Sequence, residues 1–225
     1  MMFKSFYFTH PGFVRTVNED SFYCNDEIGL WLVCDGMGGH EEGNFASHLI
    51  TDIFEEIKLE GNLEERINLM SEQLKIIHSL LEKKVEKIGG DTRIGTTLML
   101  LHIFEEKGVC IHSGDTRCYN LRNDILSTVT KDHAIEYDDY YGYRKVLTSA
   151  ISAPGNFKIE ITRFFIQAND IFLLCSDGLY DNISNRTIKN SMIENSLEKG
   201  IQRLQQEVLN STADDNITAV LIGQK

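Results

Sequence analysis

The chain has 225 residues, 42% hydrophobic and 25% charged, a composition typical of a soluble globular protein with a buried core. Its 34 acidic residues against 22 basic ones give a formal net charge of −12, which disfavours a surface that binds nucleic acid or an anionic membrane. The five cysteines show no C-x-x-C spacing, so we expect reduced thiols rather than a disulfide framework or a zinc site.

Residues 1–13 contain several aromatic side chains, but Lys4, His10 and Pro11 interrupt them before the apolar core of a signal peptide can form. No run of the chain approaches the roughly 18 apolar residues of a membrane span. We therefore expect a cytoplasmic protein without a membrane partner. Only two prolines occur, and no Gly/Ser-rich linker is present, so we expect residues 1–225 to form a single domain.

Hydrophobic periodicity predicts the elements of the first half of the chain. Short apolar runs predict strands at 22–24 and 29–34. Apolar residues that recur every three or four positions predict helices over 43–57 and 63–88. The second helix is compatible with a coiled-coil partner, but covering a sheet within the domain is the favoured interpretation. Further strands, linked by tight polar turns, are expected at 95–104, 108–113 and 116–121.

In the second half, residues 159–166 and 171–175 predict a pair of strands joined at Asn169-Asp170. Residues 184–209 predict a helical segment, and 216–223 a final strand. The helices are thus segregated from runs of antiparallel strands. This order argues for an α+β sandwich and against a doubly wound parallel sheet.

Acidic residues stand at the ends of five apolar runs. They are Glu19 with Asp20, Asp35, Asp115, Asp177, and Asp214 with Asp215. Each Asp-Gly pair alone is ordinary turn chemistry. A carboxylate at the end of a buried strand is costly, however, unless it is paired or coordinated. Recurrence at five strand ends therefore predicts one site at which oxygen ligands hold hard divalent cations.

Arg15 lies four residues before Glu19, and it is open to two interpretations. It is either a plain salt-bridge partner or, beside a two-metal site, a planar fork that binds phosphate bidentately. Two cations about 3.5–4 Å apart can share a bridging carboxylate and a bridging water, which then attacks phosphorus. Gly36, directly after Asp35, lets the backbone turn closely around an ion and can lend a carbonyl oxygen.

Six motifs occur in the order of a known family. They are Arg15-x-x-x-Glu19-Asp20, Val33-Cys34-Asp35-Gly36-Met37-Gly38-Gly39-His40, Gly95-Thr96-Thr97, Ser113-Gly114-Asp115-Thr116-Arg117, Cys175-Ser176-Asp177-Gly178-Leu179 and Asp214-Asp215-Asn216-Ile217-Thr218. With these motifs the sequence resembles bacterial metal-dependent serine/threonine phosphatases of the protein phosphatase 2C family. The resemblance runs from about Arg15 to Val220 and implies an α-β-β-α sandwich with a Mn²⁺ or Mg²⁺ pair at one end of its two sheets.

The resemblance also implies a role for each site residue. Asp35 would bridge the two core ions, and Asp20 would hydrogen-bond waters of their coordination shell. Arg15 would bind the phosphate. The remaining metal ligands would be Glu19 and the Gly36 carbonyl on one ion, Asp177 and Asp215 on the other, and Asp115 with Asp177 on a weaker third ion.

The chain departs from the family pattern at three places. Thr116 replaces the usual serine and keeps its hydroxyl. Met37 stands where eukaryotic members carry a histidine proposed as general acid; His40, nearby, is either a second candidate for that role or a structural loop residue. The flap at 134–153 looks short. It is either a solvated loop or a lid that faces the substrate, and it carries Tyr137, Tyr140, Tyr141, Tyr143, Arg144 and Lys145.

The sequence therefore predicts metal-dependent hydrolysis of phosphoserine and phosphothreonine in proteins by a metal-bridging hydroxide. The expected partners are phosphoproteins modified by a serine/threonine kinase, with no nucleic acid, and the expected state is a monomer. A degenerate binding module that senses phosphoproteins without turnover is the alternative. A two-metal nuclease is disfavoured by the −12 charge and the lack of a basic stripe.

Overall fold

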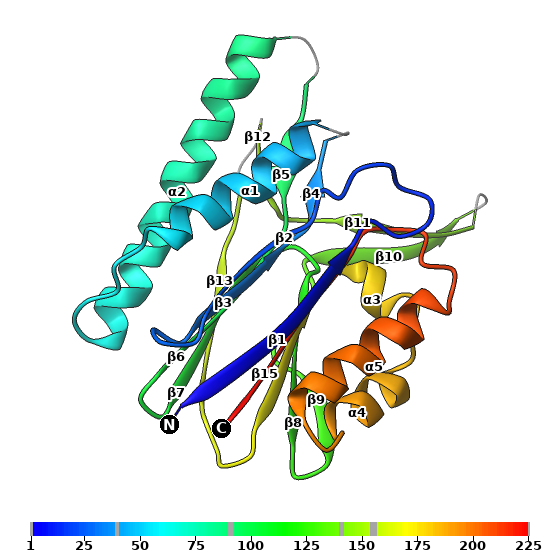
Figure 1. The fold of residues 1–225 in the computed structure, drawn as a ribbon. Coiled ribbons are helices and arrows are strands. Elements are labelled where there is room, and N and C mark those ends of the chain that lie inside the picture. Colours follow the sequence, from blue (N-terminus) through cyan, green and yellow to red (C-terminus); the bar gives the residue numbers. More distant parts are fainter. Residues whose placement is uncertain (1, 39–40, 90–91, 140–141, 154–156, 225) are drawn as a thin grey trace.

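The computed structural model describes residues 2–38, 41–89, 92–139, 142–153 and 157–224. Two five-stranded sheets pack face to face, and helices cover the outer face of each (Figure 1). All strand pairs recorded among these residues are antiparallel. The predicted α+β class, with an α-β-β-α arrangement, is therefore confirmed.

Each large sheet combines strands that are distant in the sequence. The first has the order β1 (Phe3–His10), β15 (Ile217–Gln224), β14 (Ile171–Cys175), β8 (Arg117–Arg122) and β9 (Ile125–Thr128). The second has the order β13 (Glu160–Phe165), β7 (Lys107–Ser113), β6 (Leu98–Phe104), β3 (Leu30–Cys34) and β2 (Ser21–Asn25). Strands such as β3, β6 and β14 lie inside a sheet and are covered on both faces, which explains why they are almost continuously apolar.

The side chains of β3 alternate between two cores. Leu30 and Leu32 pack towards the helices on the outer face of their sheet. Trp31 and Val33 point into the layer between the sheets, where Phe172 and Val220 of the opposite sheet also lie. All of these side chains are buried. This alternation, with period two, is what holds a strand in the middle of a four-layered sandwich.

Helices α1 (Glu41–Glu55) and α2 (Leu63–Ile88) cover the second sheet. A capping box fixes the start of α2, because the Asn62 side chain accepts from the Glu65 backbone while the Glu65 side chain accepts from the Asn62 N–H at 2.7 Å. The buried face of α2 carries Ile67, Met70, Leu74, Ile77 and Leu81. This spacing gives the stripe predicted from the sequence, and both long helices are confirmed.

Helices α3 (Asp177–Tyr180), α4 (Asn185–Met192) and α5 (Leu197–Leu209) lie beside the first sheet. The predicted helical segment over 184–209 is thus divided into two helices. Serine caps explain the division: Ser184 accepts from the Thr187 N–H, and Ser196 begins a new helix by accepting from the Lys199 N–H. Within the described residues, no helix is long and apolar enough to cross a membrane.

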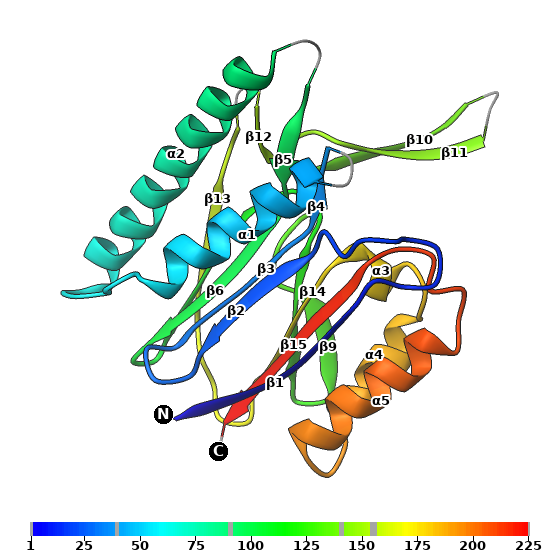
Figure 2. The same cartoon turned by 45° about the horizontal axis from the view of Figure 1, so that its top comes forward.

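Two smaller groups of strands extend one end of the sandwich (Figure 2). The strands β12 (Ile151–Ala153), β5 (Ile94–Thr96) and β4 (Gly36–Met37) form a three-stranded sheet. The strands β10 (Ala134–Asp139) and β11 (Gly142–Leu147) form a hairpin that protrudes from it. The described part of the flap over 134–153 therefore consists largely of strands, and its side chains at 135–138 are exposed, so the interpretations as a solvated segment and as a lid both stay predictions.

One predicted strand pair is wrong. Strand β13 pairs with β7, whereas β14 pairs with β8 and β15, so the two strands belong to different sheets. The link between them crosses the edge of the sandwich and is held by Asp170. This fully buried carboxylate accepts bonds of 2.7 and 2.6 Å from Arg122 and one of 2.8 Å from the Gln167 N–H. This bidentate bond holds a connection between two sheets. Its sequence is similar to that of a tight turn between neighbouring strands of one sheet.

Candidate active site

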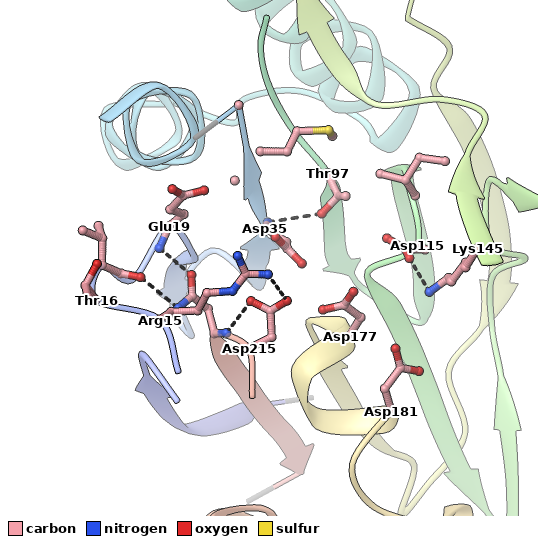
Figure 3. A pocket seen from close by; sticks show the side chains of 16 residues that line it. Arg15, Thr16, Glu19, Asp35, Thr97, Asp115, Lys145, Asp177, Asp181 and Asp215 are labelled. Carbon is pink, nitrogen blue, oxygen red and sulfur yellow. Dashed lines mark hydrogen bonds and ion pairs between the residues drawn. The ribbon is translucent and has the colours of Figure 1, made fainter. Parts of the chain in front are cut away.

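A cavity of ≈ 550 Å³ opens at the end of the sandwich where the strand ends converge. It is lined by Arg15, Thr16, Val17, Glu19, Asp35, Gly36, Met37, Gly38, Thr97, Asp115, Lys145, Leu147, Asp177, Asp181, Asp215 and Asn216. Figure 3 shows the carboxylates of Asp35, Asp177 and Asp215, which come from different elements, turned towards one another, while Asp115 faces Lys145. All predicted metal ligands line this cavity, as does Arg15; Asp20 is 4% exposed and lies behind it.

Asp35 is placed by its own backbone. Its carbonyl oxygen accepts from the Thr97 N–H at 2.8 Å and from the Thr96 hydroxyl at 2.9 Å, and its N–H donates to the Thr97 hydroxyl at 3.2 Å. These bonds fix the chain where β3 ends and β4 begins. The Asp35 side chain is therefore held by main-chain contacts, and its carboxylate stays available to the cavity.

Two glycines allow Glu19 to approach Asp35. A Cβ atom at Gly36 would lie 2.4 Å from the Gly43 carbonyl oxygen and 2.6 Å from that of Glu19. A Cβ atom at Gly43 would lie 2.4 Å from Oε2 of Glu19. Any larger residue at either position would displace the segment that carries Glu19. The Gly36 N–H also donates to the Glu19 carbonyl at 3.2 Å, which ties the two predicted ligands together.

Asn216 ties the loop that carries Arg15 and Glu19 to the start of β15. Its side-chain oxygen accepts from the Glu19 N–H at 2.8 Å. Its amide nitrogen donates to the carbonyl oxygens of Pro11 and Val17, at 3.0 Å each. One side chain thus satisfies backbone groups across this loop, beside Asp215.

Asp177 lies at the β14–α3 junction, and Asp20, which directly precedes β2, is bound to that junction through Ser176. Asp177 is the first residue of α3, and a Cβ atom at Gly178 would lie 2.1 Å from the Asn216 carbonyl oxygen, so only glycine fits there. The Ser176 hydroxyl donates to Oδ2 of Asp20 at 2.8 Å and accepts from the Thr218 N–H at 2.9 Å. The other oxygen of Asp20, Oδ1, is buried without a partner among the described residues.

Burial and mutual repulsion disfavour the ionised forms of these carboxylates. Burial raises the pKa of Asp20 to about 7. Burial, followed by the charges of Asp20 and Asp177, raises the pKa of Asp35 well above its ordinary value. Burial and the charges of Asp115 and Asp215 raise the pKa of Asp177 to about 6. Such a cluster is stable in ionised form only when cations compensate it.

The donor set fits hard divalent cations. Every predicted ligand offers oxygen, and Asp20 presents an unsatisfied buried acceptor behind the others. Among the described residues of the lining, the cationic side chains are Arg15 and Lys145. The histidine and cysteine ligands that zinc favours do not occur among these described lining residues. The residues present therefore fit a Mn²⁺ or Mg²⁺ pair.

Arg15 stands at the rim of the cavity. Its Nη2 donates to Oδ2 of Asp215 at 2.9 Å, and its side chain is 57% exposed. The bond to Asp215 raises the pKa of the guanidinium further. The ion pair that the first interpretation of Arg15 requires is therefore present. The exposed guanidinium also faces the cavity, as the phosphate-binding interpretation requires (Figure 3).

Asp115, the ligand predicted for a third ion, is held at the end of β7. The Tyr180 hydroxyl donates to its carbonyl oxygen at 2.9 Å, and Lys145 of β11 forms an ion pair with its carboxylate. Sequence reasoning missed Lys145 as a cavity residue, because its approach depends on the fold of the flap. It also missed Asp181, whose spacing of four residues from Asp177 across α3 was the available signal.

A second group of potential ligands lies outside the cavity. Ligand atoms of His112, His133 and Glu160 lie within 4.8 Å of one another. His112 faces Lys131, whose carbonyl oxygen lies 3.0 Å from its Nε2, and Nε2 of His133 lies 3.3 Å from Glu160. The Gly114 N–H donates to Nδ1 of His133 at 3.4 Å, so both ring nitrogens of His133 already face a protein group. We therefore assign this group a structural role, holding the turn before β10.

His40, the second candidate for the general acid, lies outside the described residues.

Comparisons with known proteins agree with this geometry. A model of the protein phosphatase 2C family matches residues 14–221. The serine/threonine protein phosphatase PstP of Mycobacterium tuberculosis is 28% identical over 222 residues, which cover 93% of this chain and 43% of PstP. The serine/threonine phosphatase stp of Listeria innocua is 26% identical over 236 residues, which cover 95% of this chain and 93% of that protein.

Solved structures show the same fold. PppA, described as a key regulatory component of T6SS in Pseudomonas aeruginosa, superposes with a TM-score of 0.90 at 27% identity, covering 100% of this chain and 99% of PppA. The catalytic domain of PstP, solved with 2 manganese ions, gives a TM-score of 0.82 at 26% identity, covering 99% and 98%. The fold is thus that of the bacterial serine/threonine phosphatases. The chain belongs to the protein phosphatase 2C family, and the family prediction is confirmed.

Proposed function

We propose that this chain hydrolyses phosphoserine and phosphothreonine in proteins and depends on Mn²⁺ or Mg²⁺. The observation that carries the proposal is the meeting of Glu19, Asp35, Asp177 and Asp215 around one cavity in a protein phosphatase 2C chain. The named relatives are serine/threonine phosphatases, and the similar PstP domain holds 2 manganese ions. The proposal therefore rests on site chemistry as well as on family.

The carboxylates divide into ligand sets. Asp35 would bridge the two core ions, because it is central in the cluster and its backbone is fixed by Thr96 and Thr97. Asp177 and Asp215 would complete the shell of one ion, and Glu19 and the Gly36 carbonyl that of the other. Bound divalent cations supply Lewis-acid chemistry, which stabilises the charge that develops on phosphoryl oxygens. Asp115 would hold a weaker third ion together with Asp177.

Arg15 is proposed to bind the phosphate. A guanidinium carries five N–H donors in a planar fork, and the recorded bond to Asp215 uses only part of it. The exposed side chain can therefore orient a phosphate group while Asp215 keeps the fork over the carboxylates. This arrangement would exclude wrong orientations of the phosphoester before hydrolysis.

Asp20 is proposed to act from behind the ligands. Its Oδ1 is a buried acceptor without a partner among the described residues, which is unfavourable unless a donor reaches it. A water molecule of the metal coordination shell would supply that donor. Asp20 would thus orient such a water through a hydrogen bond, while Ser176 holds the carboxylate in place.

The substrates would be proteins phosphorylated by a serine/threonine kinase. We propose that the chain meets them in the cytoplasm, as a monomer and as a single domain over 1–225. The net charge of −12 supports a protein substrate rather than nucleic acid. The degenerate binding module is the weaker candidate, because each predicted ligand position carries the expected oxygen donor.

The test is manganese-dependent release of phosphate from a phosphothreonine peptide. We expect release with manganese, none with excess chelator, and none from Asp35→Asn under either condition. Asp124→Asn, which alters an exposed carboxylate paired with Lys189, is the matched control and should retain activity. A wild-type chain that bound the phosphopeptide but released no phosphate would instead support the binding module.

A further inference from the structure

A lysine of the flap hairpin enters the cavity and pairs with the predicted third-ion ligand. Lys145 lies on β11, opposite Glu136 of β10. Its ammonium contacts Oδ2 of Asp115 and lies 2.7 Å from the Tyr180 hydroxyl oxygen. Figure 3 shows this ion pair on the opposite side of the carboxylate cluster from Arg15.

The surroundings of this ion pair show that it is well packed rather than a surface contact. The side chains of Lys145 and Asp115 are 18% and 7% exposed. Tyr180 joins the partners, because its hydroxyl accepts from Lys145 and donates to the Asp115 carbonyl at 2.9 Å. Arg117 stacks over the ring of Tyr180, 3.6 Å from its centroid, and thereby fixes it.

The Lys145 ammonium pairs directly with the Asp115 carboxylate, and the carboxylates of Asp177 and Asp181 line the same cavity. The cavity therefore contains a positive charge of its own beside Asp115.

We propose that Lys145 is an internal cation that occupies the place of the third metal ion on Asp115, so that the flap hairpin and this ion compete. The inference rests on the proposed function, because it presumes that Asp115 serves a metal. A divalent cation lies about 2.0–2.6 Å from a carboxylate oxygen. The Lys145 ammonium already occupies Oδ2 of Asp115, and a divalent cation on either oxygen of this carboxylate would stand beside the ammonium, where the two positive charges repel each other.

The competition couples ion binding to the hairpin. Lys145 is part of β11, so an ion that displaces its ammonium removes the contact that joins β11 to Asp115 and Tyr180. Without the ion, the hairpin is held against the cavity, where Leu147 is also part of the lining. With the ion, the hairpin is released and the cavity is open on that side. Lys145 is thus a positioning residue that links occupancy of the outer ion to access of the substrate.

Calorimetric titration with manganese tests the competition. Lys145→Met removes the ammonium and leaves Asp115 without a cation, so we expect manganese to bind the weak site roughly tenfold more tightly or better. Lys145→Arg keeps the charge, so its weak site should stay weak. Lys131→Met is the matched control, because it removes an exposed lysine outside the cavity, and its titration should resemble wild type. Binding at the tight sites should change little in all three variants.

Hydrogen exchange gives a second measurement that does not depend on activity. In wild type, amides of 134–139 and 142–147 should exchange faster as manganese fills the weak site. In Lys145→Met they should exchange fast already in chelator. An unchanged or weaker third site in Lys145→Met, or a wild-type hairpin insensitive to manganese, would overturn the inference and leave the proposed function intact. If wild type showed no tight manganese sites in the titration, the proposed function itself would be overturned.

Discussion

The Ser176 hydroxyl donates a 2.8 Å hydrogen bond to Oδ2 of Asp20, while Oδ1 of the same carboxylate is buried without a partner among the described residues. Burial raises the pKa of Asp20 to about 7, because the ionised form has lost the solvation of water. We therefore expect Asp20→Asn to raise the melting temperature in chelator and to lower turnover of phosphopeptide in manganese.

Thermal unfolding in chelator and steady-state kinetics in manganese measure the two effects. Asp124→Asn serves as the control for loss of a carboxylate at an exposed site. An Asp20→Asn variant that melts lower than wild type in chelator would contradict the electrostatic explanation.

Removal of metal should make stability depend on pH. The folded-state pKa values of Asp20 and Asp177 are raised, chiefly by burial, to about 7 and about 6, against about 3.9 for aspartate in an unfolded chain. A group whose pKa is raised by folding stabilises the fold at low pH, and this contribution is lost as the pH rises through the folded-state value. In chelator, the melting temperature should therefore fall as the pH rises from about 4, the unfolded-state value, to about 7, the higher folded-state value.

Manganese should suppress this fall, because cations bind the ionised carboxylates of the folded state only. Binding at about 100 times the dissociation constant adds roughly 2.7 kcal/mol to the free energy of unfolding. Melting curves at matched pH, with chelator and with millimolar manganese, provide the comparison. Parallel pH profiles in the two conditions would show that these carboxylates do not hold the metal.

Arg15→Ala should mainly raise KM, because the guanidinium binds phosphate in the ground state and the transition state alike. A charge-assisted contact is worth roughly 1.5–3 kcal/mol, so kcat/KM should fall about 10- to 150-fold. Arg163→Ala removes an exposed arginine paired with Glu64 at 2.9 Å and should leave the kinetics unchanged. If Arg15→Ala showed normal phosphopeptide kinetics, Arg15 would serve only as a structural ion-pair partner of Asp215.

Asp35 and Asp115 should differ in the ions they hold. Asp35→Asn removes the proposed bridge, so activity should be lost and both core ions should bind more weakly. Asp115→Ala should remove only the weaker ion and slow turnover. Calorimetric titration with manganese resolves the two classes of site, and circular dichroism confirms the fold. Loss of the tight sites in Asp115→Ala, or full activity of this variant, would remove Asp115 from the third site.

Gly43→Ala should weaken metal binding without removing any ligand. The new methyl group would lie 2.4 Å from Oε2 of Glu19, which must then turn away from the cavity. We expect manganese to bind one core ion about tenfold more weakly, the lower end of what loss of a charged contact costs. Asp52→Ala, on the exposed face of the same helix, is the control. Unchanged manganese titration would mean that Glu19 is not a ligand.

The position of the site could be predicted from sequence because each ligand directly follows or precedes a short apolar run. Asp35 and Asp177 end such runs, and Asp215 begins one, so strand ends that converge bring them together. The two long helices were predictable for a similar reason, since their buried faces repeat at helical spacing. In these segments, the hydrophobic pattern of the local sequence matches the burial of the side chains in the fold.

Features that depend on distant partners could not be predicted in the same way. Strand β1 pairs with β15, about two hundred residues away, and neither its mixed composition nor its neighbours predicts that pairing. The separation of β13 and β14 into different sheets depends on Asp170 and Arg122, whose contact no turn signal encodes. Lys145 reaches Asp115 only because the hairpin folds back over the cavity.

The bonds of Asn216 have a consequence for how the protein is made. This side chain, at the start of β15, holds the backbone at Pro11, Val17 and Glu19. β15 itself lies between β1 and β14. When the ribosome has synthesised the chain up to the end of α3, Arg15, Glu19, Asp35, Asp115 and Asp177 are already present. Asn216, which holds the loop that carries Arg15 and Glu19, has not yet been made. We expect a nascent chain to remain catalytically silent until β15 has emerged.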